Sequence, residues 1–152
     1  MTWKPSAGFA NDHFRLQVSV LKIIQPPHWA RPRGYSYGIR AKRQTVFLAG
    51  IVGWNASQKF ETDDFAGQFH QLMLNIVALL KEAGAKPEHI TNMTWYIADK
   101  DEYTAVLNDI GASYREIIGS HFPAMTVIEV SGFVATGTRL EIETTAVIPD
   151  SD

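Results

Sequence analysis

Two glutamates near the end of the sequence carry the side chains best suited to acid–base chemistry. Glu141 and Glu143 alternate with Leu140 and Ile142, so both carboxylates fall on one face of a predicted strand and both aliphatic side chains on the other. The plainer interpretation is a half-buried strand whose charged face meets solvent. The functional interpretation puts one carboxylate at a cleft between subunits, where it orients a water molecule.

Other chemistries lack their usual patterns. Five histidines are present, none at the spacing of a zinc-binding helix: His13, His28, His70, His89 and His121. Cysteine is absent, which removes disulfides, thiolate metal sites and a cysteine nucleophile. The glycines form neither a phosphate-binding loop nor a dinucleotide-binding motif, and Ser131 has no evident base beside it. We therefore expect no metal and no cofactor.

Aromatic and basic residues gather in the first third of the chain and just beyond it. The aromatic group could stack nucleobases, but aromatics beside Pro and Gly more often pack a loop onto its own domain; it comprises Trp29, Tyr35, Tyr37, Trp54 and Phe60. The basic group is either a solvated face or an anion-binding rim, and comprises Arg31, Arg33, Arg40, Lys42 and Arg43.

Length and charge bound the remaining classes. The chain has 152 residues, 45% of them hydrophobic and 20% charged, which is typical of one globular domain. The formal net charge of −2 argues against a nucleic-acid partner. No apolar run approaches the roughly 20 residues that span a bilayer, and no leader pattern opens the sequence, so we expect no membrane contact and a cytoplasmic location.

The patterning predicts an α+β fold. Strands are predicted over 18–24, 38–41, 45–50, 90–98, 124–130 and 139–148. Two amphipathic helices are predicted over 64–83, capped by Thr62 or Asp63, and over 101–118. The economical arrangement is one mixed six-stranded sheet with both helices on one face. The other face would be bare, and a bare apolar face favours an oligomer.

Five short segments in order resemble the Rid family, the YjgF-like reactive enamine/imine deaminases. They are the strand that ends at Gly50, the helix with Gln68 and Ala83-Gly84, the strand 90–99, Pro123-Ala124-Met125-Thr126-Val127, and Leu140-Glu141-Ile142-Glu143 with Ala146. The resemblance implies a chorismate-mutase-like fold, a homotrimer with a central barrel, and small-molecule clefts between subunits. It divides the chain into an N-terminal arm over 1–34, with a first strand near 18–24, and a Rid-like domain over 35–150.

The family's reaction hydrolyses reactive enamines and imines to keto acids and ammonia without a cofactor. Carried over by resemblance, the catalytic candidates are Glu141, which positions water, and Tyr35. The carboxylate-binding arginine of the family falls on Met125, and its Ser-Gly-Gln falls on Ala49-Gly50-Ile51, so the pattern resembles arginine-lacking subgroups. The residues expected to bind ligand are Gly50, Ile51, Trp54, Met125 and Thr126.

Three functions remain open. The first is hydrolysis of an enamine, imine or related reactive metabolite other than 2-aminoacrylate, because a methionine thioether cannot replace a guanidinium's charged contact with a carboxylate. The second is a non-catalytic module that binds or senses a small apolar or aromatic ligand. The third, an endoribonuclease activity, is disfavoured by the charge.

Overall fold

The computed structural model describes residues 21–24, 27, 38–41 and 44–148, and within these the fold is built on a four-stranded sheet. Its strands are β3 (Gln44–Val52), β4 (Ile90–Ile97), β5 (Ala124–Glu129) and β6 (Leu140–Ile148). They lie in the order β3-β6-β4-β5. β6 is antiparallel to both of its neighbours, whereas β4 and β5 are parallel. The mixed α+β architecture expected from the sequence is confirmed.

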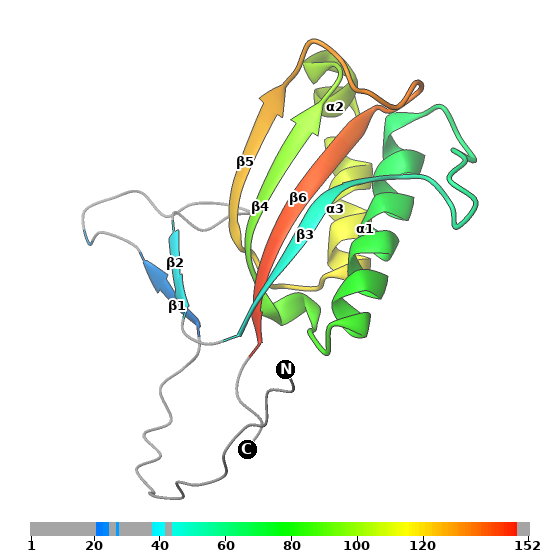
Figure 1. The fold of residues 1–152 in the computed structure, drawn as a ribbon. Helices are drawn as coiled ribbons and strands as arrows, with labels where there is room; N and C mark the ends of the chain where they lie inside the picture. The colour runs from blue at the N-terminus through cyan, green and yellow to red at the C-terminus, as the bar shows by residue number, and fades with distance from the viewer. Residues whose placement is uncertain (1–20, 25–26, 28–37, 42–43, 149–152) are drawn as a thin grey trace, which may run out of the picture.

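The prediction of one six-stranded sheet is wrong. β1 (Leu21–Ile24) and β2 (Gly38–Ala41) form a separate antiparallel pair, in which Leu21 lies opposite Ala41. The facing backbone groups of β1 and β2 pair with each other. Among the described residues, no strand pairing joins β1 or β2 to the edge strands β3 and β5. Figure 1 shows the pair set apart from the main sheet.

The helices in the described part of the chain lie on one side of the sheet (Figure 1). They are α1 (Phe65–Glu82), the short 3₁₀ helix η1 (Pro87–His89), α2 (Lys100–Ala105) and α3 (Leu107–Ile117). Within the described ranges, no helix has the length and apolar character that crossing a membrane requires.

The first helix follows its sequence signals closely, with one correction. Its N-cap is Asp64 rather than Thr62 or Asp63, because the Asp64 carboxylate accepts the backbone N–H of Gly67 at 2.7 Å. At the other end Gly84 takes a left-handed φ of +72°, as a glycine after a helix commonly does.

The second predicted helix is divided in two. Val106 stands between α2 and α3 with φ −116° and ψ 20°, outside the helical range. The Val106 N–H donates to the carbonyl of Tyr103, three residues back, at 3.3 Å. This spacing is that of a 3₁₀ turn, and α2 ends there. α3 then runs beside α1 on the same side of the sheet (Figure 1).

The core fills the space between the helices and the sheet. α1 contributes a continuous apolar stripe, in which Leu80 is fully buried, whereas its neighbour Leu79 is exposed. β6 contributes the alternate residues Leu140, Ile142, Thr144 and Ala146, as its sequence pattern predicts. None of the helices among the described residues covers the other face of the sheet, where Phe47 of β3 is 78% exposed.

Candidate functional site

Glu141 and Gly50 meet on the uncovered face of the sheet. The register between β3 and β6 shifts between Leu48 and Ile51, so a bulge falls at this point. A Cβ built on Gly50 would coincide with the Glu141 carboxylate. Glycine therefore leaves the space that the carboxylate occupies, and the two residues predicted from the sequence are brought together by the fold.

The two glutamates of β6 differ in their partners. The Tyr96 hydroxyl donates to Glu143 Oε2 at 2.7 Å, and this hydrogen bond is the main reason that the pKa of Tyr96 is raised. Glu141 is half-buried and makes no hydrogen bond or ion pair within the described part of the chain. Of the two carboxylates, Glu141 is therefore the one without a hydrogen-bond partner among the described residues.

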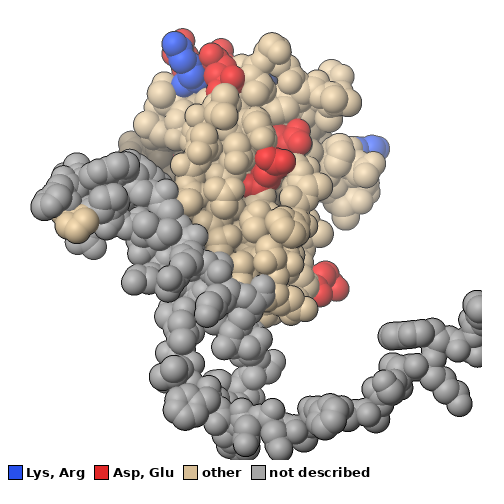
Figure 2. Space-filling model, turned by 60° about the vertical axis from the view of Figure 1, so that its left-hand side comes forward, with Lys and Arg blue, Asp and Glu red and all other residues tan. Residues whose placement is uncertain are grey.

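A shallow depression of about 290 Å³ adjoins these carboxylates; we call it the carboxylate hollow. Its walls come from β4, β6 and the segment after β5, and are Tyr96, Val130, Gly132, Phe133, Glu141 and Glu143. Figure 2 shows this side of the molecule, where acidic side chains are surrounded by uncharged residues.

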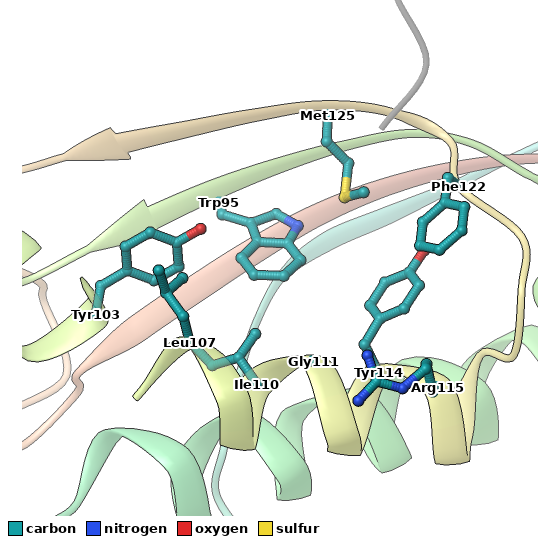
Figure 3. Close-up of a pocket in the computed structure, with 9 residues that line it drawn as sticks. All are labelled: Trp95, Tyr103, Leu107, Ile110, Gly111, Tyr114, Arg115, Phe122 and Met125. Carbon is teal, nitrogen blue, oxygen red and sulfur yellow. The ribbon is translucent and has the colours of Figure 1, made fainter. Parts of the chain in front are cut away.

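A second hollow, of about 330 Å³, lies on the helix-covered face between α3 and the strands β4 and β5; we call it the aromatic pocket. Trp95 and Met125 line it from the strands, and Tyr103 and Phe122 from the segments on either side of α3. α3 itself contributes Leu107, Ile110, Gly111, Tyr114 and Arg115. In Figure 3 these side chains converge from both sides on one space.

Met125 and Glu141 face opposite sides of the sheet. In the parallel ladder Met125 pairs with Met93, which is buried under the helices, whereas Glu141 projects from the uncovered face of β6. One chain therefore does not bring together these two predicted site residues.

The other predicted ligand-binding residues are dispersed. Ile51 packs against the core on the helix side, and Thr126 is exposed on the uncovered face. Trp54 follows β3, where its carbonyl accepts from the Asn75 amide at 2.8 Å and its ring lies 6.3 Å from that of Phe60. Neither Ile51 nor Trp54 lines either hollow. Tyr35 lies outside the described residues.

The sequence reasoning missed most of the aromatic pocket. The sequence predicts Trp95 within the strand 90–98 and Tyr103 and Tyr114 within the helix 101–118, and no local pattern indicates that these residues share a cavity. Burial raises the pKa of both tyrosines, so their hydroxyls stay protonated well above neutral pH. The Tyr114 hydroxyl is engaged, since it donates to the His121 carbonyl at 2.7 Å.

The fold and the two hollows define a small α+β protein with a carboxylate site on one face of its sheet and an apolar pocket on the other. Residues 29–148 match the family model described as Endoribonuclease L-PSP. The chain therefore belongs to the Rid (YjgF-like) family that carries this description.

Relatives agree with this family. A goat protein named 2-iminobutanoate/2-iminopropanoate deaminase is 31% identical over 114 residues, covering 74% of this chain and 79% of the relative. A RutC family protein from Aquifex aeolicus is 32% identical, covering 84% and 99%. A solved Rid-family structure from Yersinia pestis, described as a protein of unknown function, has a TM-score of 0.73 at 27% identity and covers 85% and 99%.

Proposed function

We propose that this chain hydrolyses a small reactive imine or enamine to a carbonyl compound and ammonia. The observation that carries the proposal is the Glu141 carboxylate, half-buried, unpaired among the described residues and seated over Gly50 beside a hollow. A positioned carboxylate without a competing partner is suited to orient water and take its proton. The deaminase name of the goat relative supports the same reaction class.

In the proposed reaction, water attacks the imine carbon and Glu141 accepts a proton from it. The carbon–nitrogen bond then breaks, the water oxygen becomes the carbonyl oxygen, and both water protons end on the nitrogen, which leaves as ammonia. The protein supplies position and one proton acceptor, and the chemistry requires no oxidant.

We place the site between copies of the chain. The uncovered sheet face exposes Phe47 and Ile128, and a face of this kind favours association. Association through it, in the homotrimer that the resemblance implies, allows Glu141 of one copy to approach the aromatic pocket of another. This arrangement accounts for two site candidates that lie on opposite faces of one sheet.

Met125 argues against 2-aminoacrylate as the substrate. Its thioether lies among aromatic rings in the aromatic pocket and offers no charged hydrogen bond to a carboxylate. The same observation favours a second candidate function, a module that binds an apolar ligand without turning it over. An endoribonuclease activity fits poorly, because Glu141 and Glu143 on the open face repel phosphate.

The proposal is tested by supplying imines in solution. An amino-acid oxidase generates imines from a panel of amino acids, and semicarbazide traps the imine faster than it traps the 2-oxo acid formed by hydrolysis. We expect the protein to lower the initial rate of semicarbazone formation for at least one imine. No change across the panel, with a folded protein, contradicts the hydrolase. Saturable thermal stabilisation by a ligand without turnover supports the binding module instead.

A further inference from the structure

The aromatic pocket has rigid, flat walls. Behind Trp95 lies Phe69, with ring centroids 5.1 Å apart, and behind Tyr103 lies Phe65, at 5.9 Å. Tyr114 and Phe122, on the far side, are stacked at 5.7 Å with an interplanar angle of 7°. Rings that are held by other rings keep their orientation, so the pocket is a preformed slot for a flat apolar group.

The size of the pocket fits such a group. Its volume of about 330 Å³ lies at the lower end of the range for small-molecule sites, roughly 300–1,000 Å³. Met125 supplies an apolar and flexible side chain at the strand wall, where Figure 3 shows its sulfur next to the indole ring of Trp95. A single aromatic ring with a short side chain is accommodated by these dimensions.

One cation stands at this pocket. The guanidinium of Arg115 lies over Gly111, one helical turn earlier, where a Cβ would come within 3.3 Å of its Nη1 atom. Arg115 makes no ion pair or hydrogen bond within the described part of the chain. A guanidinium with this freedom is suited to hold a carboxylate through two parallel hydrogen bonds.

A buried donor in the same pocket also lacks a partner. Trp95 is only 4% exposed, and its indole Nε1 is buried with no hydrogen-bond acceptor. Figure 3 places this nitrogen on the edge of the ring that faces Met125. Buried donors are nearly always paired in folded proteins, so an unpaired one on a cavity wall points to an acceptor that a ligand brings once the Met125 side chain moves aside.

We propose that the aromatic pocket binds aromatic 2-imino acids and their 2-oxo acid products, with Arg115 holding the carboxylate in place of the missing strand arginine. The aromatic ring lies between Trp95 and Tyr114, and the indole N–H meets an oxygen or nitrogen of the ligand. This assignment rests on the proposed hydrolase function, for which it names the substrate class. Water converts the imine to the oxo acid and ammonia, with no further reactant.

Binding by isothermal titration calorimetry tests the assignment, with 2-oxo-3-phenylpropanoate and pyruvate as the probes. We expect the wild-type protein to bind the aromatic acid at least about 10-fold more tightly than pyruvate, because only the aromatic acid fills the slot. Arg115→Gln is expected to lower the affinity for the aromatic acid by about 10-fold or more, and Arg115→Lys is expected to lower it by less. Lys81→Gln, which removes an exposed cation from α1, serves as the matched control and leaves affinity unchanged.

A second variant separates occupancy of the pocket from its charge. Leu107→Trp leaves Gly111 and Arg115 unchanged but enlarges a side chain that lines the pocket and is 47% exposed, so aromatic binding is expected to fall while the thermal midpoint is kept. Equal binding of both acids, or full affinity in Arg115→Gln, overturns the assignment. Turnover of small imines without aromatic binding overturns only the substrate class, whereas aromatic binding through Arg115 without any turnover overturns the hydrolase.

Discussion

On the helix-covered face of β6, Leu140 and Ile142 are fully buried, whereas Glu141 and Glu143, each one residue away, stand on an open face. The covered face is a packed core with one aromatic pocket, and the uncovered face carries carboxylates beside exposed apolar side chains. The two faces therefore divide the work. The covered face holds the fold together and contains the aromatic pocket, whereas the uncovered face carries the proposed acid–base group and the proposed surface for association.

The largest expected difference between the two faces is in how substitutions on them affect the oligomeric state. Phe47, on the uncovered sheet face, and Leu74, which is 43% exposed on α1, are both apolar side chains in solvent in the single chain. We expect Phe47→Asp to convert the proposed trimer to monomers, because a charge would be buried at the interface, and Leu74→Asp to leave it intact.

Light scattering at micromolar concentration measures this difference directly. A wild-type monomer, or equal masses for the wild-type protein and both variants, would contradict association through the sheet.

Substitutions of two glycines near the end of β3 are expected to differ, one lowering stability and the other lowering turnover. A Cβ on Gly53 would overlap the backbone carbonyl of Gln68, which cannot move aside easily, so Gly53→Ala is expected to cost about 1–3 kcal/mol of unfolding free energy. The atoms nearest to a Cβ on Gly50 all belong to the flexible side chain of Glu141. Gly50→Ala is therefore expected to keep its stability within about 0.5 kcal/mol and to lose turnover by about 10²-fold, because the carboxylate is displaced.

Urea unfolding and turnover, measured on both variants, check the pair. The comparison fails if Gly50→Ala is fully active, or if it is the less stable of the two.

The smallest effect concerns the cap of α1, the helix that covers the sheet. Hydrogen bonds from the Thr62 hydroxyl and then from the Gly67 N–H lower the pKa of Asp64. A carboxyl with a lowered folded-state pKa stabilises the fold above its ordinary pKa, and this contribution is lost as pH falls through the lowered value. Asp64→Ala is expected to cost about 1 kcal/mol near neutral pH.

The cost of Asp64→Ala should shrink as the pH is lowered below the ordinary carboxyl range. Unfolding free energies from pH 7 down to pH 3 check it, with Asp109→Ala, an exposed change in the first turn of α3, as the control. A cost that does not change over this range would show that the carboxylate charge is irrelevant.

Sequence patterns predicted what depends on neighbours along the chain. The alternation in 139–148 placed Glu141 and Ile142 on opposite faces, and the spacing in 64–83 predicted α1, including the glycine that ends it. The separation of β1 and β2 from the main sheet and the break at Val106 depend on backbone pairing, which local patterns do not encode.

The site was predictable only in part for a similar reason. Family resemblance pointed to Gly50, Glu141 and Met125, and the fold does seat Glu141 over Gly50. The relative faces of Met125 and Glu141 could not be predicted, because β4 lies between their strands and fixes both registers. The aromatic pocket joins residues of β4, β5 and α3 that are far apart in the sequence, and only their packing makes them neighbours.

The most direct measurement compares Glu141→Gln with Glu143→Gln, two neighbouring carboxylates on one strand face that have different partners. On an imine that the wild-type protein hydrolyses, kcat is expected to fall by about 10²- to 10⁴-fold in Glu141→Gln, because the amide cannot accept the proton of water. In Glu143→Gln, which alters the partner of Tyr96, kcat is expected to stay within about 3-fold of wild type. Wild-type turnover in a folded Glu141→Gln variant would contradict the proposed mechanism.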